Sequence, residues 1–279
     1  MSDLPAATRI APTPSGYLHR GNAVNFLLVR WLADAIGATV RLRIDDMDVD
    51  RYRQEYVQDV FEVLQWLGID WQGGPVDVND FQERHSLRSR THLYRSEAAR
   101  LHAAGSAYAC TCSRRQGGGQ CVQDCRSRQH PLTPGQSALR LAIAPGTTIE
   151  VDGTAIDLAH ELGDPVLWRR DDRVSYHLAS VVEDRDHGIT HVVRGEDLRI
   201  CSALHRHLAE LLGSTTEIEY RHHPLLVDER GVKLSKSQMQ RGPLHRTDAL
   251  REDIYLRAEA LAQALLRRET GPDRSHPSL

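Results

Sequence analysis

The sequence predicts an α/β fold built on a parallel sheet, because strand and helix patterns alternate along its first hundred residues. A short apolar strand at 8–11 is followed by a helical pattern of apolar residues at 23–36. The alternating stretch 39–44 is followed by an amphipathic pattern at 56–67, and a further helix is expected at 88–104. Strands that alternate with helices at this spacing normally pair in parallel.

The middle of the chain, residues 106–164, departs from this alternation. It contains four cysteines, a glycine triplet and short β-like pieces, and we interpret it as an insertion. From Pro165 the α/β pattern returns, with strands expected at 166–170 and 191–195 and a helix at 200–212. The expected organisation is two halves of one α/β domain around the insertion, then a short helical stub and a disordered tail: 1–105, 106–164, 165–242, 243–268 and 269–279.

The composition is that of a soluble globular protein, with 40% hydrophobic and 26% charged residues. A net charge of −3 argues against a strongly basic surface for nucleic acid, although a local arginine-lined groove stays open. No apolar run approaches the roughly 18 residues of a membrane span, and the first residues lack the apolar core of a signal peptide. A cytoplasmic protein without a membrane partner is expected, with a monomer as the default.

Lysine is almost absent from the chain. Lys233 and Lys236, in "GVKLSKSQ", are its only lysines among 35 lysine and arginine residues. Arginine replaces lysine easily where only a surface charge is needed, but not where a compact ammonium must reach a phosphate. The pattern therefore favours phosphate chemistry at this stretch, and the alternative is chance survival in a surface loop.

A turn rich in proline and glycine, "PTPSGYLHRGN", lies between the first strand and the first helix. In an open α/β sheet this crevice is where ligands bind. Gly16 and Gly21 allow a ligand to approach the backbone, and His19 precedes a helix N-terminus, where amide groups favour anions. The turn matches neither GxGxxG nor a P-loop, so a purely structural role for His19 is the alternative.

The insertion carries four closely spaced cysteines, Cys110, Cys112, Cys121 and Cys125. Four thiolates this close in a cytosolic chain favour tetrahedral Zn²⁺ over disulfides. Because four protein ligands close the coordination sphere, the zinc would be structural. The spacing is unusual for a zinc finger, so incidental thiols or a degenerate metal site are the alternatives.

Together, "HRGN" and "KLSKS" resemble the HIGH and KMSKS signatures of class I aminoacyl-tRNA synthetases. The surrounding blocks resemble the catalytic body of glutamyl-tRNA synthetases: "RIAPTPSGYLHRGN", "VRLRIDDMDVDR", "YHLASVVEDRDHGITHVVRGEDL" and "YRHHPLLVDERGVKLSKS". The resemblance implies a Rossmann-like class I synthetase fold. It also implies activation of glutamate by ATP, with Mg²⁺, to glutamyl-adenylate, followed by transfer to RNA. The chain departs from HIGH at Arg20 and Asn22.

The resemblance also assigns roles to residues. It implies catalytic roles at the ATP phosphates for His19, Lys233 and Lys236, and further ATP contacts for Gly16, Gly21, Asn22 and Ser235. It implies that Arg9 and Arg194 bind the carboxylates of glutamate, with Thr13 and Tyr176 as further contacts. Asp45 matches the acid that receives the α-amine, where bacterial glutamate enzymes usually carry Glu.

Little chain follows Ser237, which leaves no room for the large anticodon-binding part of a discriminating glutamyl-tRNA synthetase. The shortened form that the chain resembles best is the glutamyl-Q tRNA(Asp) synthetase group, which attaches glutamate to the queuosine base of tRNA(Asp). One alternative is a glutamate-activating ligase that loads another acceptor, a tRNA 3′ end or a carrier protein. The other is a catalytically silent RNA-binding relative, against which the two retained lysines argue.

Overall fold

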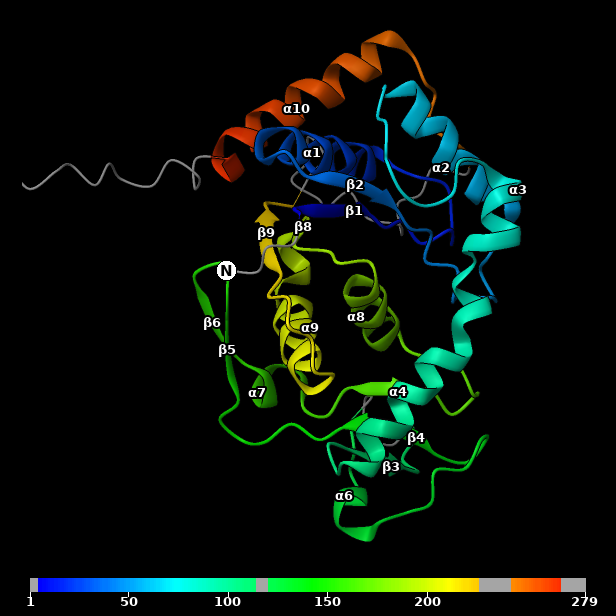
Figure 1. Ribbon diagram of the computed structural model, residues 1–279, viewed down its shortest axis with the longest axis vertical. Coiled ribbons are helices and arrows are strands. Elements are labelled where there is room, and N and C mark those ends of the chain that lie inside the picture. The colour runs from blue at the N-terminus through cyan, green and yellow to red at the C-terminus, as the bar shows by residue number, and fades with distance from the viewer. Residues whose placement is uncertain (1–4, 114–119, 226–241, 267–279) are drawn as a thin grey trace, which may run out of the picture.

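The computed structural model describes residues 5–113, 120–225 and 242–266 (Figure 1). The first part of the chain forms β1 (Ala7–Ile10), α1 (Arg20–Ile36), β2 (Thr39–Leu42), α2 (Gln54–Trp66), α3 (Val78–Asp80) and α4 (Thr91–Ala103). The middle forms β3 (Ala107–Cys110), α6 (Cys125–Arg128), β4 (Ala138–Leu141), β5 (Thr148–Val151), β6 (Thr154–Asp157), α7 (Leu158–Leu162) and β7 (Val166–Trp168). The last part forms α8 (Tyr176–Asp186), β8 (His191–Gly195), α9 (Arg199–Leu211), β9 (Glu219–His223) and α10 (Asp248–Leu266).

Two parallel two-stranded sheets lie side by side and together make the layer called the central sheet below; the alternating pattern predicted their parallel pairing. β1 pairs with β2, and β8 pairs with β9. The pairs meet where the backbone N–H of Thr190 donates to the Ala7 carbonyl at 2.9 Å and the Ala7 N–H donates to the Thr190 hydroxyl at 2.9 Å. Segments far apart in the sequence thus lie side by side, so residues that follow β1 and β8 meet at one edge.

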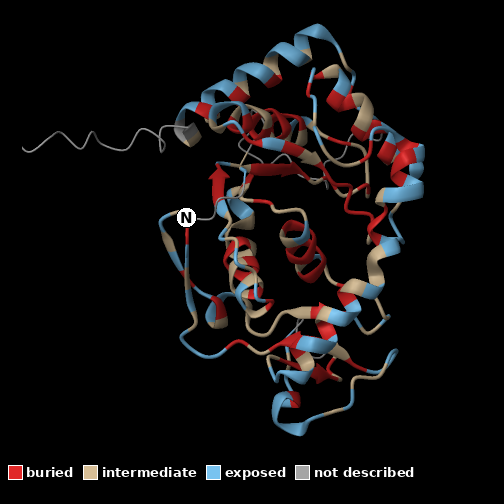
Figure 2. Ribbon diagram, in the orientation of Figure 1, coloured by how far each residue is buried: buried red, intermediate tan, exposed pale blue. Residues whose placement is uncertain are grey.

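Helices cover this sheet and bury its apolar side chains. α1 and α10 pack together above it, while α8 and α9 lie below, and the buried residues in Figure 2 concentrate between these layers. The expected helix at 23–36 begins earlier, at Arg20, because His19 caps it. No helix among the described residues is long and apolar enough to cross a membrane.

The strand expected at 166–170 does not return to the parallel sheet. It forms β7, which pairs antiparallel with β4 in the three-stranded sheet β3-β4-β7. Its apolar residues gave no sign of which sheet it would join, because β propensity does not encode the partner. In this small sheet β3 ends at Cys110, and the sheet lies at the opposite end of the molecule from α10 (Figure 1). The tail 269–279 lies outside the described residues.

A separate hairpin, β5-β6, turns at Asp152 and Gly153, which both have positive φ angles of 55° and 70°. Aspartate and glycine are preferred in such two-residue turns because they tolerate this conformation. The hairpin packs against α9. It thereby comes close to the strands of the central sheet, although it lies within the segment 106–164.

Candidate active site

An open pocket of about 450 Å³ lies at the edge where β1 and β8 end. Residues from β1, α1, α8, β8 and β9 and from the turn after β1 line it. Six of the residues expected from the sequence are among them: Arg9, His19, Gly21, Asn22, Tyr176 and Arg194. Thr13, Gly16 and Asp45 do not line it. Lys233, Ser235 and Lys236 lie outside the described residues.

The turn before α1 is held by a reciprocal capping arrangement. The Nδ1 atom of His19 accepts a hydrogen bond from the Gly21 N–H at 3.1 Å, and the Asn22 Oδ1 atom accepts from the His19 N–H at 3.0 Å. This arrangement satisfies two of the N–H groups that a helix start leaves unpaired. Asn22 thus has a local structural reason for its polarity.

Arg20 does not crowd the pocket. Its side chain is half exposed and forms an ion pair at 3.6 Å with Asp253 of α10. Its bulk therefore lies against α10 rather than among the pocket-lining residues.

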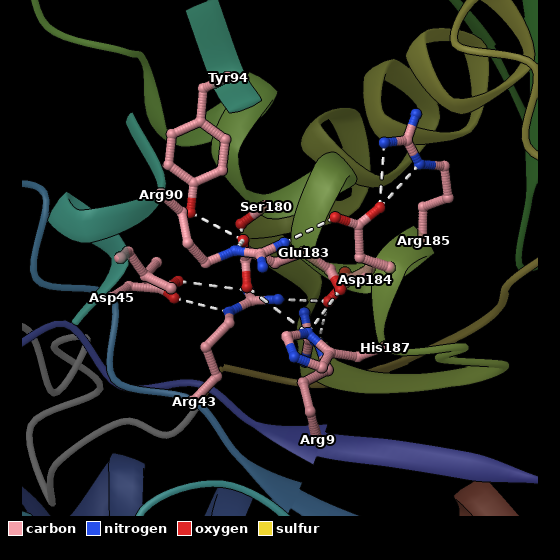
Figure 3. Close-up of polar contacts among 12 residues, drawn as sticks. Arg9, Arg43, Asp45, Arg90, Tyr94, Ser180, Glu183, Asp184, Arg185 and His187 are labelled. Carbon is pink, nitrogen blue, oxygen red and sulfur yellow. Dashed lines mark hydrogen bonds and ion pairs between the residues drawn. The ribbon is translucent and has the colours of Figure 1, made fainter. Parts of the chain in front are cut away.

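A compact network of charges lies beside the pocket (Figure 3). Asp184 of α8 accepts from Arg9 at 3.2 Å and from Arg43 at 2.5 Å through the same oxygen. Arg43 also donates to both oxygens of Asp45, at 2.7 and 3.3 Å. Burial opposes ionisation of Asp184, but Arg9 and Arg43 outweigh it and lower its pKa. Burial raises the pKa of Asp45, against the attraction of Arg43.

Arg194 is buried to a similar degree but has different neighbours. It is 4% exposed, and its Nε and Nη2 atoms donate to the Ser202 hydroxyl at 2.9 and 2.5 Å. The Nη1 atom approaches the Tyr176 hydroxyl at 3.5 Å, and the guanidinium lies 4.8 Å from the centre of the Tyr220 ring. Among the described residues, no carboxylate forms an ion pair with Arg194.

Several polar residues around Arg194 were missed by the sequence reasoning. His222 and Asp152 continue the contacts of Ser202, and His177 lies 3.2 Å from His205. Burial and then Arg194 lower the pKa of His177 to about 4 and of His222 to about 3, so both are neutral at pH 7. Asp184 was missed as well, although an acid inside the apolar stretch "SYHLASVVED" could have marked it as a buried partner.

The four cysteines come together as expected. Their Sγ atoms all lie within 4.8 Å of one another, with Cys112 at 4.0 Å from Cys121 and 3.7 Å from Cys125. Four sulfurs at about 2.3 Å from a tetrahedral zinc would be roughly 3.8 Å apart, so the cluster fits the ion. At Cys121, burial is outweighed by the backbone N–H groups of Cys125 and Gln123, which lower the thiol pKa to about 7. Thiolate, the form that binds metal, is therefore accessible at Cys121 near neutral pH, whereas burial raises the pKa of Cys110 to about 12.

Comparison with known proteins identifies the class. Residues 6–117 and 119–276 match the family model described as "tRNA synthetases class I (E and Q), catalytic domain". The chain therefore belongs to the class I tRNA synthetases of the glutamate and glutamine type, a family of ligases. Its fold is also that of a solved glutamate tRNA ligase from Elizabethkingia meningosepticum, with a TM-score of 0.69 and 25% identity over 84% of this chain and 52% of that one.

Within this family, the chain is similar to proteins named glutamyl-Q tRNA(Asp) synthetase. The protein from Rhodobacter capsulatus is 36% identical, and the match covers 95% of this chain and 99% of the relative. The protein from Prochlorococcus marinus strain MIT 9303 is 37% identical over 88% of this chain and 76% of its own length. A glutamate–tRNA ligase from Magnetococcus marinus is 34% identical, and the match covers only 50% of that protein.

Proposed function

We propose that this enzyme activates glutamate with ATP and transfers it to the queuosine base in the anticodon loop of tRNA(Asp). The observation that carries glutamate recognition is Arg194. A buried guanidinium without a carboxylate partner is costly unless a ligand supplies the negative charge. Arg194 lines the pocket, and the side-chain carboxylate of glutamate can fill that role by a bidentate pair.

The charge around the pocket supports the same substrate. Three buried arginines, Arg9, Arg43 and Arg194, face two buried carboxylates, Asp45 and Asp184. Among these buried groups one positive charge is in excess, while Asp197, which also lines the pocket, is exposed to solvent. Glutamate at neutral pH carries one net negative charge, whereas glutamine carries none, so the excess favours glutamate. Arg9 would assist at a carboxylate, Asp45 would receive the α-amine, and Thr13 and Tyr176 would complete the contacts.

ATP would occupy the turn from Gly16 to Asn22, with Mg²⁺ on its phosphates. Gly21 lets a ligand approach the backbone, the N-terminus of α1 favours anions, and His19 lies at that terminus. Lys233 and Lys236, with Ser235, would hold the phosphates from the other side as pyrophosphate leaves. Zn²⁺ would be held by the four cysteines and would stabilise the small sheet β3-β4-β7.

The proposal of queuosine as the acceptor is supported by the similarity to relatives. The chain aligns with 99% of the glutamyl-Q protein of Rhodobacter capsulatus but with only half of the Magnetococcus marinus glutamate–tRNA ligase. A 3′-end acceptor or a carrier protein remains the second candidate, because it would use the same amino acid and ATP contacts.

The test is transfer of labelled glutamate, with ATP and Mg²⁺, to two tRNA pools that differ only in queuosine. We expect label on the queuosine pool alone. Label on both pools would mean ordinary 3′-end charging and would overturn the queuosine acceptor. Label on neither pool, with glutamate-dependent pyrophosphate exchange intact, would direct the search to an acceptor other than tRNA.

A further inference from the structure

A chain of hydrogen bonds leads from the pocket to the β5-β6 hairpin. The Ser202 hydroxyl, which accepts from Arg194, lies 2.6 Å from the Nε2 atom of His222. The Nδ1 atom of His222 lies 3.2 Å from the Asp152 carboxylate, which also accepts from the His222 backbone N–H at 3.2 Å. The order is therefore Asp152, His222, Ser202 and Arg194. His222 and Asp152 have side chains that are 0% and 3% exposed.

The number of protons available determines which group donates and which accepts in each of these hydrogen bonds. A hydroxyl accepts two hydrogen bonds and donates one. Both acceptor positions of Ser202 are occupied by Arg194. The imidazole Nε2 atom therefore cannot donate to Ser202 and must accept from it, so His222 carries its proton on Nδ1 and donates it to Asp152. The Ser202 proton is shared with the Leu198 carbonyl at 3.1 Å.

The sequence of groups is that of an acid–histidine–serine triad, yet its environment excludes nucleophilic catalysis. Ser202 is 0% exposed, and its lone pairs face the guanidinium rather than the pocket. A charged imidazolium would also place a second cation beside Arg194, and burial together with Arg194 keeps the pKa of His222 low. The function of this chain of hydrogen bonds must therefore be to hold Arg194 in place.

Asp152 could owe its identity to the turn alone, because aspartate suits a positive φ angle. A turn residue needs only a solvated side chain, however, and the Asp152 carboxylate is buried and accepts two hydrogen bonds from His222. Arg199 approaches the same carboxylate at 3.9 Å and donates to Thr154 at 3.0 Å. The hairpin is thus tied to the amino-acid side of the pocket at its tip.

We propose that Asp152, His222 and Ser202 are positioning residues that aim the Arg194 guanidinium at the substrate's side-chain carboxylate. The hairpin thereby contributes to the choice of glutamate over glutamine. This inference rests on the proposed function for the identity of the substrate, but the hydrogen-bond chain itself is independent of it.

The first experiment is amino-acid-dependent ATP–pyrophosphate exchange with the Asp152→Asn variant. Asparagine keeps the turn preference and the shape, and removes the charge that orients His222 and that Arg199 approaches. We expect the KM for glutamate to rise about ten-fold, with the KM for ATP unchanged and the preference for glutamate over glutamine reduced. Ser202→Ala, which leaves Arg199 untouched, should produce the same selective change.

The matched control is Glu150→Gln, which removes one negative charge from the same hairpin at an exposed position. It should leave both KM values unchanged. A purely structural role for Asp152 would lower the melting temperature without altering the ratio of glutamate to glutamine. Unchanged glutamate KM and selectivity in Asp152→Asn and Ser202→Ala, beside an active wild type, would overturn the inference and leave the proposed function intact.

The tautomer of His222 decides the hydrogen-bond chain without any activity. Nitrogen chemical shifts of ¹⁵N-histidine-labelled protein, assigned by comparison with His222→Gln, should report a neutral ring protonated on Nδ1 at pH 7. A proton on Nε2 would overturn the inference. Absence of glutamate-dependent ATP–pyrophosphate exchange in the wild type would instead contradict the proposed function. The tautomer of His222 would still test the hydrogen-bond chain.

Discussion

Two buried arginines at one pocket, Arg9 and Arg194, have opposite surroundings. Arg9 is 6% exposed and forms an ion pair with Asp184, which also holds Arg43 and through it Asp45. Arg194 is 4% exposed and is held by a serine hydroxyl, a tyrosine hydroxyl and an aromatic ring. Equal burial therefore hides a difference in electrostatic compensation.

The difference separates stability from recognition. Around Arg9 the protein supplies its own negative charge, so removing one partner leaves a buried charge uncompensated. Around Arg194 the described residues supply only neutral acceptors, which fix the direction of the guanidinium without neutralising its charge. Substitutions on the Arg9 side should thus affect folding first, and substitutions on the Arg194 side should affect substrate binding first.

The largest expected effect is on stability, in Asp184→Asn. This change leaves Arg9 and Arg43 facing a neutral amide, and we expect a loss of about 3–5 kcal/mol in the free energy of unfolding. Urea denaturation followed by circular dichroism measures it. Asp186→Asn, two residues further along α8 and partly exposed, is the control and should cost less than about 1 kcal/mol. Equal losses in the two variants would contradict the comparison.

The next effect is on activity, in Arg194→Gln. We expect glutamate-dependent pyrophosphate exchange to fall about 100-fold in kcat/KM, because the carboxylate loses its charged partner. The free energy of unfolding should stay the same or rise, because the variant removes a buried cation that has no carboxylate partner among the described residues. Arg194→Lys keeps the positive charge but loses the guanidinium's two parallel N–H groups, so its kcat/KM should lie between those of the wild type and Arg194→Gln. A large loss of stability in Arg194→Gln would show that Arg194, like the Arg9 network, serves folding, and would contradict the comparison.

The Arg194 side and the Arg9 side of the pocket should also lose stability in different pH ranges. Unfolded histidines bind protons near pH 6.5, whereas burial and Arg194 hold the pKa of His177 at about 4 and of His222 at about 3. Between about pH 6.5 and 4 the unfolded state thus binds more protons, so stability falls as pH falls, on the order of a few kcal/mol. Asp184, with its lowered pKa, adds its loss only below its ordinary value of 3.8.

Urea midpoints at pH 7, 5.5 and 4.5 measure this loss. The decrease of stability with falling pH should be smaller in Arg194→Gln, since Arg194 contributes to the lowered pKa of both His177 and His222. A stability that is flat across this interval would mean that the histidines are not held neutral.

The smallest effect is expected in Tyr176→Phe. The Tyr176 hydroxyl lies 3.5 Å from Arg194, and the residue is 40% exposed, so this contact is long and partly solvated. We expect the KM for glutamate to rise only two- to five-fold, which corresponds to less than about 1 kcal/mol. Steady-state exchange kinetics measure it. A loss as large as that of Ser202→Ala would show that Tyr176, rather than Ser202, orients Arg194.

Sequence patterns predicted what local chemistry determines. The parallel strand pairing, the first helix and the approach of the four cysteines follow from periodicity and spacing, and the structure agrees with each, except that the helix begins at Arg20 rather than Ala23. The antiparallel pairing of β7 could not be predicted, because an apolar strand does not specify its partner. The roles of Ser202 and His222 could not be predicted either, since they arise from contacts between distant residues, and the sequence could mark Asp184 as a buried acid but could not name Arg9, 175 positions away, as its partner.

The β5-β6 hairpin has a consequence for exchanging parts between related synthetases. Asp152 and His222 lie 70 positions apart, so a graft that replaces the segment 106–164 as one block carries Asp152 but leaves His222 behind. Such a chimera would inherit the cysteine cluster complete, yet its amino-acid preference would depend on whether donor and recipient share both halves of the pair. Successful grafts should therefore be those in which the two positions are transplanted together.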